Sequence, residues 1–457
     1  MGATHPLVNR ELNAAIAFLA RPLPNFGLAS GSVDVQTFLH HVALIANELP
    51  SSRYIINMCT NRYLFVVTFC ATIVQGKTNL LPANKNKVAQ RELADCYVNC
   101  CVVHDGADVD ASLPSVNLAA QPFGKKTTTY DTTTPSIPSI ADNHLACISF
   151  TSGSTGESKP NLKYWRTLRE SSAINYQHML GSIDGTLFQL ATMPAQHMWG
   201  LETSVLLPMF FDVCLCDAQP LFPQDIVDLL DQLPEPTLLV STPVHLRALL
   251  SAKPEAIKLH TVLCATSPLT KELANQIESM FDCELREVYG CSEVGSMAVR
   301  RTAKELRWRR FDGIDFTTSN GSTITSADHL PEPITLQDQI NTVDAHHFEL
   351  RGRTSDLIKI AGKRGSLFAI NQVLLKFNGL QDGVVIKPDS TSETARPCAI
   401  VALQSTSSKA ALLSYLRDQL DSAFVPRPIY VVDELPRESN GKLVKAKLMK
   451  LLEQLKN

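Results

Sequence analysis

From residue 145 onward, short apolar runs alternate with segments whose apolar residues recur at helical spacing. The runs LACISF, TLFQLAT, VCLCDA, TLLVST, TVLCA and ELREVY predict strands at 145–150, 186–192, 213–218, 237–242, 261–265 and 284–289. Between the last three, PVHLRALLSA and LTKELANQIESM predict helices. This alternation is typical of an α/β fold, in which helices cover the faces of a mostly parallel sheet.

Beyond residue 353 the pattern changes. DLIKI, GVVIKP and CAIVALQ predict short strands, and helical spacing appears at 409–420 and 442–455. Roughly a hundred residues remain here, which is enough for one small α+β domain. We therefore predict a large N-terminal domain, residues 1–353, and a small C-terminal domain, residues 354–457. The Thr- and Pro-rich segment 125–139 predicts an exposed connection within the first.

The composition indicates a globular protein with a large core. Hydrophobic residues make up 44% and charged residues 19%, and the net charge of −3 provides no general attraction to nucleic acid or anionic membranes. The longest apolar run, YLFVVTFCATIV at 63–74, is too short to span a bilayer and predicts a core helix. The start lacks an apolar signal core, and Pro6 interrupts a myristoylation pattern.

Twelve cysteines are scattered along the chain without the spacing of a metal site. The close pairs, Cys100 with Cys101 and Cys214 with Cys216, lie among apolar residues. We interpret them as small buried hydrophobic residues in a reducing compartment, which predicts a cytoplasmic location.

The strand at 145–150 leads into TSGSTGESK, which is typical of a phosphate-binding loop. Gly, Ser and Thr allow backbone N–H groups and hydroxyls to converge on an anion. The Walker loop of P-loop NTPases does not fit, because Gly153 and Gly156 are three residues apart and Pro160 stands where that loop needs Ser or Thr. A flexible linker would leave both the buried-type strand and Lys159 unexplained.

Four further motifs follow in a fixed order: VYGCSEVG at 288–295, LQDQI at 336–340, LRGRTSDLIKIAGKR at 350–364 and LPRESNGKL at 435–443. With the phosphate loop, this set resembles the adenylate-forming superfamily of acyl-CoA synthetases, aryl-CoA ligases, luciferases and peptide-synthetase adenylation domains. The superfamily joins a carboxylic acid to ATP, releases pyrophosphate and passes the acyl group to a thiol. The resemblance also implies that the C-terminal domain is mobile.

The resemblance implies roles for residues at the ATP site. The loop residues Thr151, Ser152, Gly153, Ser154, Thr155, Gly156 and Lys159 would hold the β- and γ-phosphates. Glu293 would ligate Mg²⁺, a cation that prefers carboxylate and phosphate oxygens. Ser292 would reach the α-phosphate, and Tyr289 would pack on the adenine. The alternative for Glu293 is an ordinary solvated carboxylate.

Three residues nearer the C-terminus complete the implied site. Asp338 would accept both ribose hydroxyls, although Leu336 and Gln337 replace the usual Thr-Gly before it. Asp344 is a competing candidate whose spacing to Gly352–Arg353 is too short. Arg353 would hold ribose or phosphate oxygens, and Lys442 would bridge the carboxylate and the α-phosphate. A surface Asp and a surface Lys are the plainer interpretations.

The segment MPAQHMWGLETSVLLPMFF at 193–211 occupies the place of the acyl-side motif. His197 would close the carboxylate end of the acyl pocket, although a histidine in apolar surroundings is often structural. The pattern around it most resembles the compact ligases of aryl-polyene and fatty-acid-type synthesis clusters. Two departures are Ser355, where the hinge usually has Asp or Lys, and the pocket floor ATSPL at 265–269.

The predicted function is an ATP- and Mg²⁺-dependent acid–thiol ligase that activates an aromatic or fatty acid as an acyl-adenylate. The acceptor would be CoA or the phosphopantetheine of an acyl carrier protein. One alternative is an adenylating enzyme with an amine or carrier-domain acceptor. Another is a non-catalytic acyl- or nucleotide-binding protein, which would have no need for Lys442.

Overall fold

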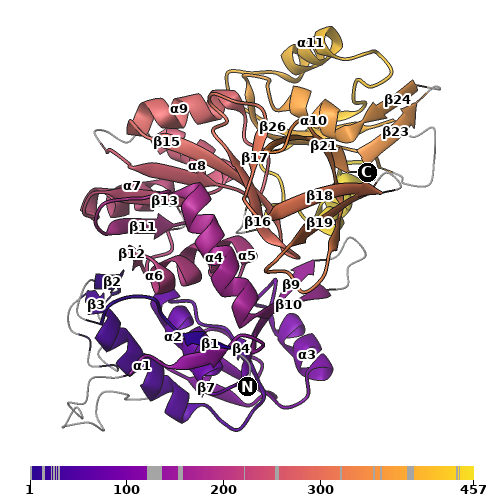
Figure 1. Cartoon of the computed structure of the whole chain (residues 1–457). Coiled ribbons are helices and arrows are strands. Elements are labelled where there is room, and N and C mark those ends of the chain that lie inside the picture. Colours follow the sequence, from indigo (N-terminus) through magenta and orange to yellow (C-terminus); the bar gives the residue numbers. More distant parts are fainter. Residues whose placement is uncertain are drawn as a thin grey trace.

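A computed structural model gives the fold of the chain (Figure 1). The structure describes residues 3–12, 16–21, 23, 26, 28, 31–120, 136–152, 158–220, 222–252, 257–319, 322–353, 356–360, 363–388, 396–438, 441 and 443–456.

The first half of the chain builds a six-stranded sheet with the order β10-β9-β5-β4-β6-β7. Its strands are β4 (Tyr54–Asn57), β5 (Thr78–Leu81), β6 (Cys100–His104), β7 (Ser115–Asn117), β9 (Leu145–Ser152) and β10 (Ser158–Tyr164). All neighbours are parallel except β9 and β10, which form an antiparallel hairpin. The accompanying helices are α1 (Val35–Glu48), α2 (Arg62–Val74) and α3 (Lys87–Cys96).

The second sheet has eleven strands in the order β21-β22-β17-β16-β15-β14-β13-β11-β12-β2-β3. Its parallel centre comprises β2 (Ile16–Leu19), β12 (Val213–Cys216), β11 (Leu187–Ala191), β13 (Thr237–Ser241), β14 (Thr261–Cys264) and β15 (Glu284–Cys291). Antiparallel strands extend both edges: β3 (Ser32–Asp34), β16 (Gly295–Arg300), β17 (Trp308–Arg310), β22 (His347–Arg353) and β21 (Asp338–Thr342).

Helices accompany this second sheet. They are α4 (Trp165–Met179), α5 (Met198–Leu201), α6 (Leu207–Phe210), α7 (Pro223–Gln232), α8 (Pro243–Ala252) and α9 (Lys271–Phe281), with a π-helical segment, Glu202–Leu206, between α5 and α6. Two smaller sheets complete this part: β18 (Ile314–Ser319), β19 (Ser322–Ala327) and β20 (Ile334–Leu336) in one, β1 (Thr4–Pro6) and β8 (Ser139–Ala141) in the other.

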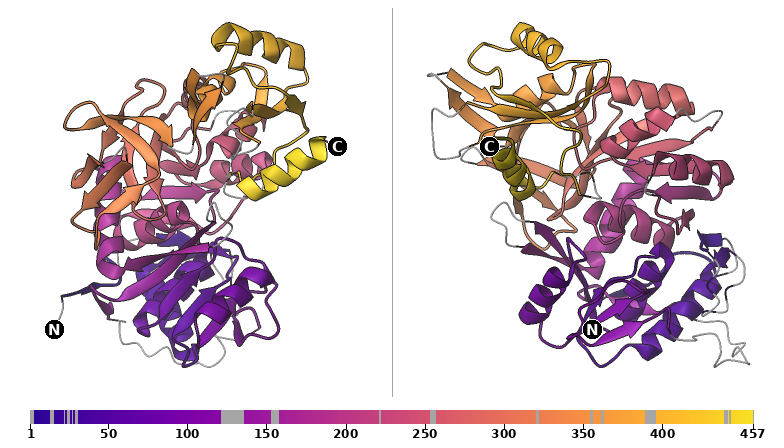
Figure 2. Two further views of the ribbon diagram at one scale, coloured as in Figure 1. Left: turned by 90° about the vertical axis from the view of Figure 1, so that its right-hand side faces the viewer. Right: turned by 180° about the vertical axis from the view of Figure 1, so that it is seen from behind.

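The C-terminal segment forms a smaller α+β unit. It contains β23 (Leu357–Ile360), β24 (Lys363–Ser366), α10 (Leu367–Leu374), β25 (Leu380–Ile386), β26 (Cys398–Leu403), α11 (Lys409–Gln419), β27 (Ile429–Val431) and α12 (Lys445–Lys456). Two hydrophobic clusters lie wholly within residues 358–452. In all views α11 lies at the end of the molecule away from the six-stranded sheet (Figure 2).

The α/β fold predicted from the sequence is confirmed, and each strand predicted between 145 and 289 is present. The predicted core helix is α2, which is buried along nearly its whole length. The close cysteine pairs are buried and unpaired, as expected. Most of the predicted connection at 125–139 lies outside the described residues, and Ser139 already begins β8. Every helix that the structure describes is too short or too polar to cross a membrane.

Candidate active site

The predicted phosphate loop lies at the tip of the β9–β10 hairpin. Thr151 pairs with Lys159 and Ser152 with Ser158, so the two strands bring both ends of the loop together. Lys159 is exposed at this tip, as a residue that meets a polyphosphate must be. Gly153, Ser154, Thr155 and Gly156 lie outside the described residues.

Glu293 lies in the tight turn that connects β15 to β16 in the second sheet. The Nζ atom of Lys163, on β10, donates a hydrogen bond of 2.7 Å to the backbone carbonyl of Glu293. Burial and the nearby carboxylate of Glu293 raise the pKa of Cys291 to about 12, so that thiol stays protonated. Ser292, the residue between them, is half-buried. The hairpin and the turn are therefore joined directly.

A buried carboxylate supports the same turn. Glu202 accepts hydrogen bonds from the backbone N–H of Ser296 at 2.9 Å, from the Ser296 hydroxyl at 2.7 Å and from Asn175 Nδ2 at 3.0 Å. Burial raises the pKa of Glu202, while these donors and Lys163 act in the opposite direction. Burial likewise lowers the pKa of Lys163, and nearby groups that include Glu202 oppose that shift.

Tyr289, Asp338 and Arg353 form one hydrogen-bonded cluster. The Tyr289 hydroxyl donates to Asp338 Oδ2 at 3.0 Å, and Arg353 Nε donates to Asp338 Oδ1 at 2.9 Å. Asp338 and Arg353 also face each other across β21 and β22. Burial and the Asp338 carboxylate raise the pKa of Tyr289 well above its ordinary value, so the phenol remains a donor. The competing candidate, Asp344, instead accepts from the backbone N–H groups of His346 and His347.

The predicted acyl-side motif shares a hydrophobic cluster with Tyr289. Trp199 on α5 belongs to the hydrophobic cluster that also contains Tyr289 and Ala265, the first residue of the ATSPL segment. His197 precedes α5 as its N-cap residue, and its backbone N–H donates to Pro194 O at 3.2 Å. A Cβ at Gly200 would lie 1.9 Å from the same carbonyl, so this turn requires glycine.

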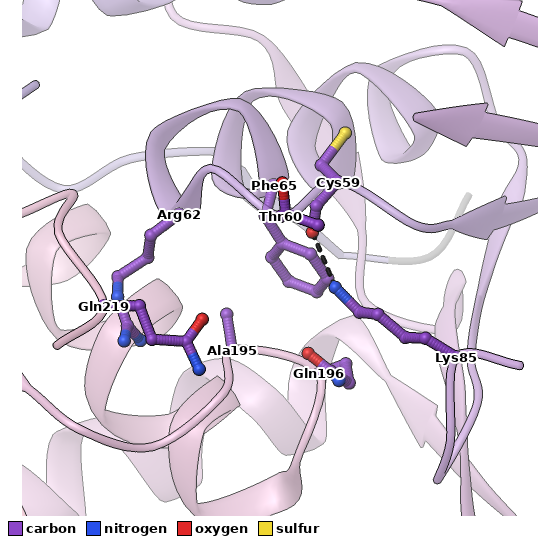
Figure 3. Close-up of a pocket in the computed structure, with 8 residues that line it drawn as sticks. All are labelled: Cys59, Thr60, Arg62, Phe65, Lys85, Ala195, Gln196 and Gln219. Carbon is purple, nitrogen blue, oxygen red and sulfur yellow. Dashed lines mark hydrogen bonds between the residues drawn. The ribbon is translucent and has the colours of Figure 1, made fainter. Parts of the chain in front are cut away.

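A pocket lies beside the loop that leads into α5 (Figure 3). Ala195 and Gln196, the two residues before His197, line it. Arg62 at the start of α2 and Lys85 after β5 supply positive charge on its wall. The Lys85 ammonium donates to Cys59 O at 2.7 Å, as the figure shows.

Lys442 lies outside the described residues, but its neighbour Gly441 is placed. Gly441 has a φ of +75°, and a Cβ there would lie 3.2 Å from Thr242 Oγ1, just before α8 of the N-terminal domain. Arg437 donates to Gly441 O at 2.6 Å and holds Asp382 with two further bonds of 2.6 and 2.7 Å. These bonds shape the backbone that leads into Lys442. Ser355, at the predicted hinge, also lies outside the described residues.

The described side chains suit a magnesium nucleotide. Asp338 offers acceptor oxygens for hydroxyl groups, and Lys159 offers an exposed cation. Among the described residues, no group of three or more His, Cys, Asp or Glu side chains could hold a metal ion by itself. Proteins commonly hold Mg²⁺ through one or two carboxylates together with substrate phosphates. Glu293 is the candidate carboxylate.

Two residues in this region were not assigned a role from the sequence. Lys163 gives no signal, because a lysine near a strand end usually points to solvent. Glu202 does give a signal, since it is the single charged residue in the mostly apolar stretch MWGLETSVLLPMFF. A charge in such surroundings indicates a buried polar network.

Comparison with known proteins identifies the family of the chain. The family model for AMP-binding enzymes matches residues 44–322, and the model for the AMP-binding enzyme C-terminal domain matches residues 369–442. A 3,4-dihydroxybenzoate–[aryl-carrier protein] ligase of Bacillus anthracis is 23% identical over 328 residues, which are 68% of this chain and 76% of that protein.

Other similarities are more local. A peroxisomal benzoate–CoA ligase of Arabidopsis thaliana is 32% identical over 117 residues, 22% of this chain and 20% of that ligase. The match to a probable peroxisomal acyl-activating enzyme of the same plant also spans about a fifth of that enzyme's length. Among solved structures, O-succinylbenzoate coenzyme A synthetase of Bacillus subtilis in complex with AMP superposes with a TM-score of 0.77 at 15% identity, over 98% of both chains. At this identity the superposition establishes the fold.

Proposed function

Because the chain belongs to the family of AMP-binding enzymes, we propose that it activates a carboxylic acid with ATP and transfers the acyl group to a thiol. The observation that carries the proposal is the cluster of Tyr289, Asp338 and Arg353. It presents an aromatic ring, an acceptor carboxylate and a cation together, on the same sheet as the turn that contains Glu293. These are the groups that a nucleoside phosphate requires.

In the first step, a carboxylate oxygen attacks the α-phosphorus of ATP and pyrophosphate leaves, which gives the acyl-adenylate. In the second, a thiol sulfur attacks the acyl carbon, AMP leaves and the thiol proton passes to solvent. Lys159 and Lys442 would reduce the repulsion between the carboxylate and the polyphosphate. Glu293 would hold Mg²⁺, and the bound cation would neutralise charge on the departing pyrophosphate.

The acid class we infer is aromatic or fatty, and the acceptor is CoA or the phosphopantetheine of a carrier protein. Relatives named as an aryl-carrier ligase and as a benzoate–CoA ligase support this range. We propose that His197 and Trp199 border the acyl group, since Trp199 shares a hydrophobic cluster with Tyr289. Free buried cysteines favour a reducing compartment, and we propose the cytoplasm.

We also propose that residues 354–457 form a domain that rotates between the two steps. Its separate hydrophobic clusters support this, because a unit with its own core can move as a body. The resemblance assigns Lys442, in this unit, to the first step alone.

ATP–pyrophosphate exchange across a panel of aromatic and fatty acids tests the function. Exchange that depends on one class of acid is expected. The acceptor would then be identified by supplying amines, CoA and a phosphopantetheinylated carrier protein separately and measuring acyl transfer to each. If no acid promotes exchange while AMP still binds, the chain is a nucleotide-binding protein on this fold and the proposal is wrong.

A further inference from the structure

Two ionisable side chains outside the proposed catalytic groups are buried beneath the turn that carries Glu293. Lys163 is 1% exposed and Glu202 is 3% exposed. Burying a charged group is costly unless it is hydrogen-bonded or paired, and each of these two is hydrogen-bonded toward the turn. The burial of Lys163 and Glu202 beneath this turn therefore suggests a functional role.

Lys163 connects the two halves of the proposed nucleotide site. It lies on β10, four residues after Lys159 at the tip of the phosphate hairpin. Its ammonium group reaches the second sheet and donates to the backbone carbonyl of Glu293 at 2.7 Å. One side chain thus fixes how far the turn lies from the strand that leads to the phosphate loop.

Glu202 fixes the other end of the same turn. Both of its oxygens accept from Ser296, one from the backbone N–H and one from the hydroxyl, and Asn175 supplies a third donor. Gly295, directly before Ser296, has a φ of +101°, and a Cβ there would lie 2.6 Å from Glu202 Oε1. The carboxylate therefore lies against the backbone, and the turn is held at residues 293 and 296.

We propose that Lys163 and Glu202 are positioning residues that set the distance between the Glu293 carboxylate and the phosphate hairpin, and so the affinity of the enzyme for magnesium in the reaction. This inference rests on the proposed function. Neither residue contacts substrate; each acts through the backbone of the turn. Outer groups of this kind commonly change metal affinity or activity by about 10- to 100-fold.

The test compares Lys163→Met with Lys85→Met. Lys85 also donates from its ammonium group to a backbone carbonyl, Cys59 O at 2.7 Å, but it lines the pocket beside Ala195 and Gln196 rather than the turn that carries Glu293. For each variant we would measure the Mg²⁺ concentration that gives half-maximal ATP–pyrophosphate exchange, the thermal midpoint, and AMP binding without magnesium.

For Lys163→Met we expect the half-maximal Mg²⁺ concentration to rise by about tenfold or more, while AMP binding changes less than about twofold. Lys85→Met should leave the Mg²⁺ dependence unchanged even where it lowers the thermal midpoint. Glu202→Gln, which keeps one acceptor oxygen, should shift the Mg²⁺ dependence less than Glu202→Met. An unchanged Mg²⁺ dependence in folded Lys163→Met overturns the proposal.

Ser296→Ala provides a milder version, because it removes a single hydroxyl donor from Glu202. It should shift the Mg²⁺ dependence in the same direction, and it provides the test if Lys163→Met does not fold. A folded Ser296→Ala with the Mg²⁺ dependence of the unmodified protein would count against the inference. Absence of acid-dependent exchange in the unmodified protein would contradict the proposed function itself. Exchange with unaltered magnesium dependence in all variants would contradict the positioning role alone.

Discussion

At the scale of single residues, the proposed nucleotide site depends on how one carboxylate is shared. Asp338 accepts from Tyr289 with one oxygen and from Arg353 with the other. Each oxygen has further acceptor capacity, so the same carboxylate can receive two hydroxyl donors without losing its protein partners. The tyrosine and arginine then fix its orientation before a ligand arrives.

Asp338→Asn tests this arrangement. The amide replaces one acceptor oxygen with a donor that faces either Tyr289 or Arg353, so a charge-assisted hydrogen bond is lost. We expect the KM for ATP to rise by about tenfold or more, which corresponds to ~1.4 kcal/mol. Asp344→Asn is the matched control, since that carboxylate accepts only from its own turn and from the ring of His347. Equal effects of the two substitutions would show that Asp338 has no special part in binding.

At the scale of elements, helix α2 fastens the two sheets to each other. Arg62, its first residue, is 2% exposed and donates to Met193 O at 2.7 Å, to Ala191 O at 2.8 Å and to Ser204 Oγ at 3.0 Å. These acceptors belong to β11, the loop after it and the π-helical segment of the second sheet's helices. One guanidinium therefore holds the loop that leads to His197 against the first sheet.

Arg62→Met should destabilise the N-terminal domain. It would leave three buried acceptors without this donor, and we expect the free energy of unfolding to fall by about 3 kcal/mol or more. Lys258→Met is the control, because both side chains of its ion pair with Asp282 are exposed and the pair should contribute ~1 kcal/mol or less. Urea unfolding followed by tryptophan fluorescence would report both. Similar small losses in the two variants would contradict the fastening role of α2.

Much of the element pattern could be predicted from the sequence, for a physical reason. Parallel strands buried on both faces are continuous apolar runs, so β12, β13 and β14 can be predicted from the runs VCLCDA, TLLVST and TVLCA. The antiparallel extension from β16 to β21 was not predicted. β17, β21 and β22 are only partly buried and lack a continuous apolar run, and β17 pairs with β22 across a long stretch of chain.

The sequence likewise predicts some parts of the candidate site and not others. The phosphate loop and the YGCSE turn are visible because their residue types and spacing are unusual. The contact between Lys163 and Glu293 could not be predicted, since it joins residues 130 positions apart through a backbone carbonyl, which any residue supplies. Sequence patterns report side chains, whereas this contact depends on the fold.

At the scale of the whole molecule, the C-terminal unit rests on the N-terminal domain near Thr242. Gly441 lies close to Thr242 and Val244, which follow the end of β13. Arg437 binds both Asp382 and the Gly441 carbonyl within the C-terminal unit itself, so the backbone beside Lys442 keeps its shape whichever way the unit is turned. The position of that backbone relative to the nucleotide site would then depend on rotation of the unit.

Lys442→Ala should separate the two steps of the reaction. A cation between carboxylate and polyphosphate is most stabilising as charge moves onto pyrophosphate, whereas thiol attack on the acyl-adenylate involves no polyphosphate. We expect acyl-adenylate formation to fall by about 10²-fold or more, and thioester formation from supplied acyl-adenylate to remain. Lys445→Ala, at an exposed position at the start of α12, is the control. If single-turnover kinetics show both steps falling together, either Lys442 is structural or the domain does not rotate.

The central claim, that the acid is activated as an acyl-adenylate, can be tested by following one oxygen atom. The reaction would be run with a carboxylic acid labelled with ¹⁸O in both carboxyl oxygens, ATP, Mg²⁺ and the thiol acceptor, and AMP would be analysed by mass spectrometry. If the carboxylate attacks the α-phosphorus and AMP leaves from the acyl carbon, each AMP carries one labelled oxygen. Unlabelled AMP, or label in inorganic phosphate, would contradict the account.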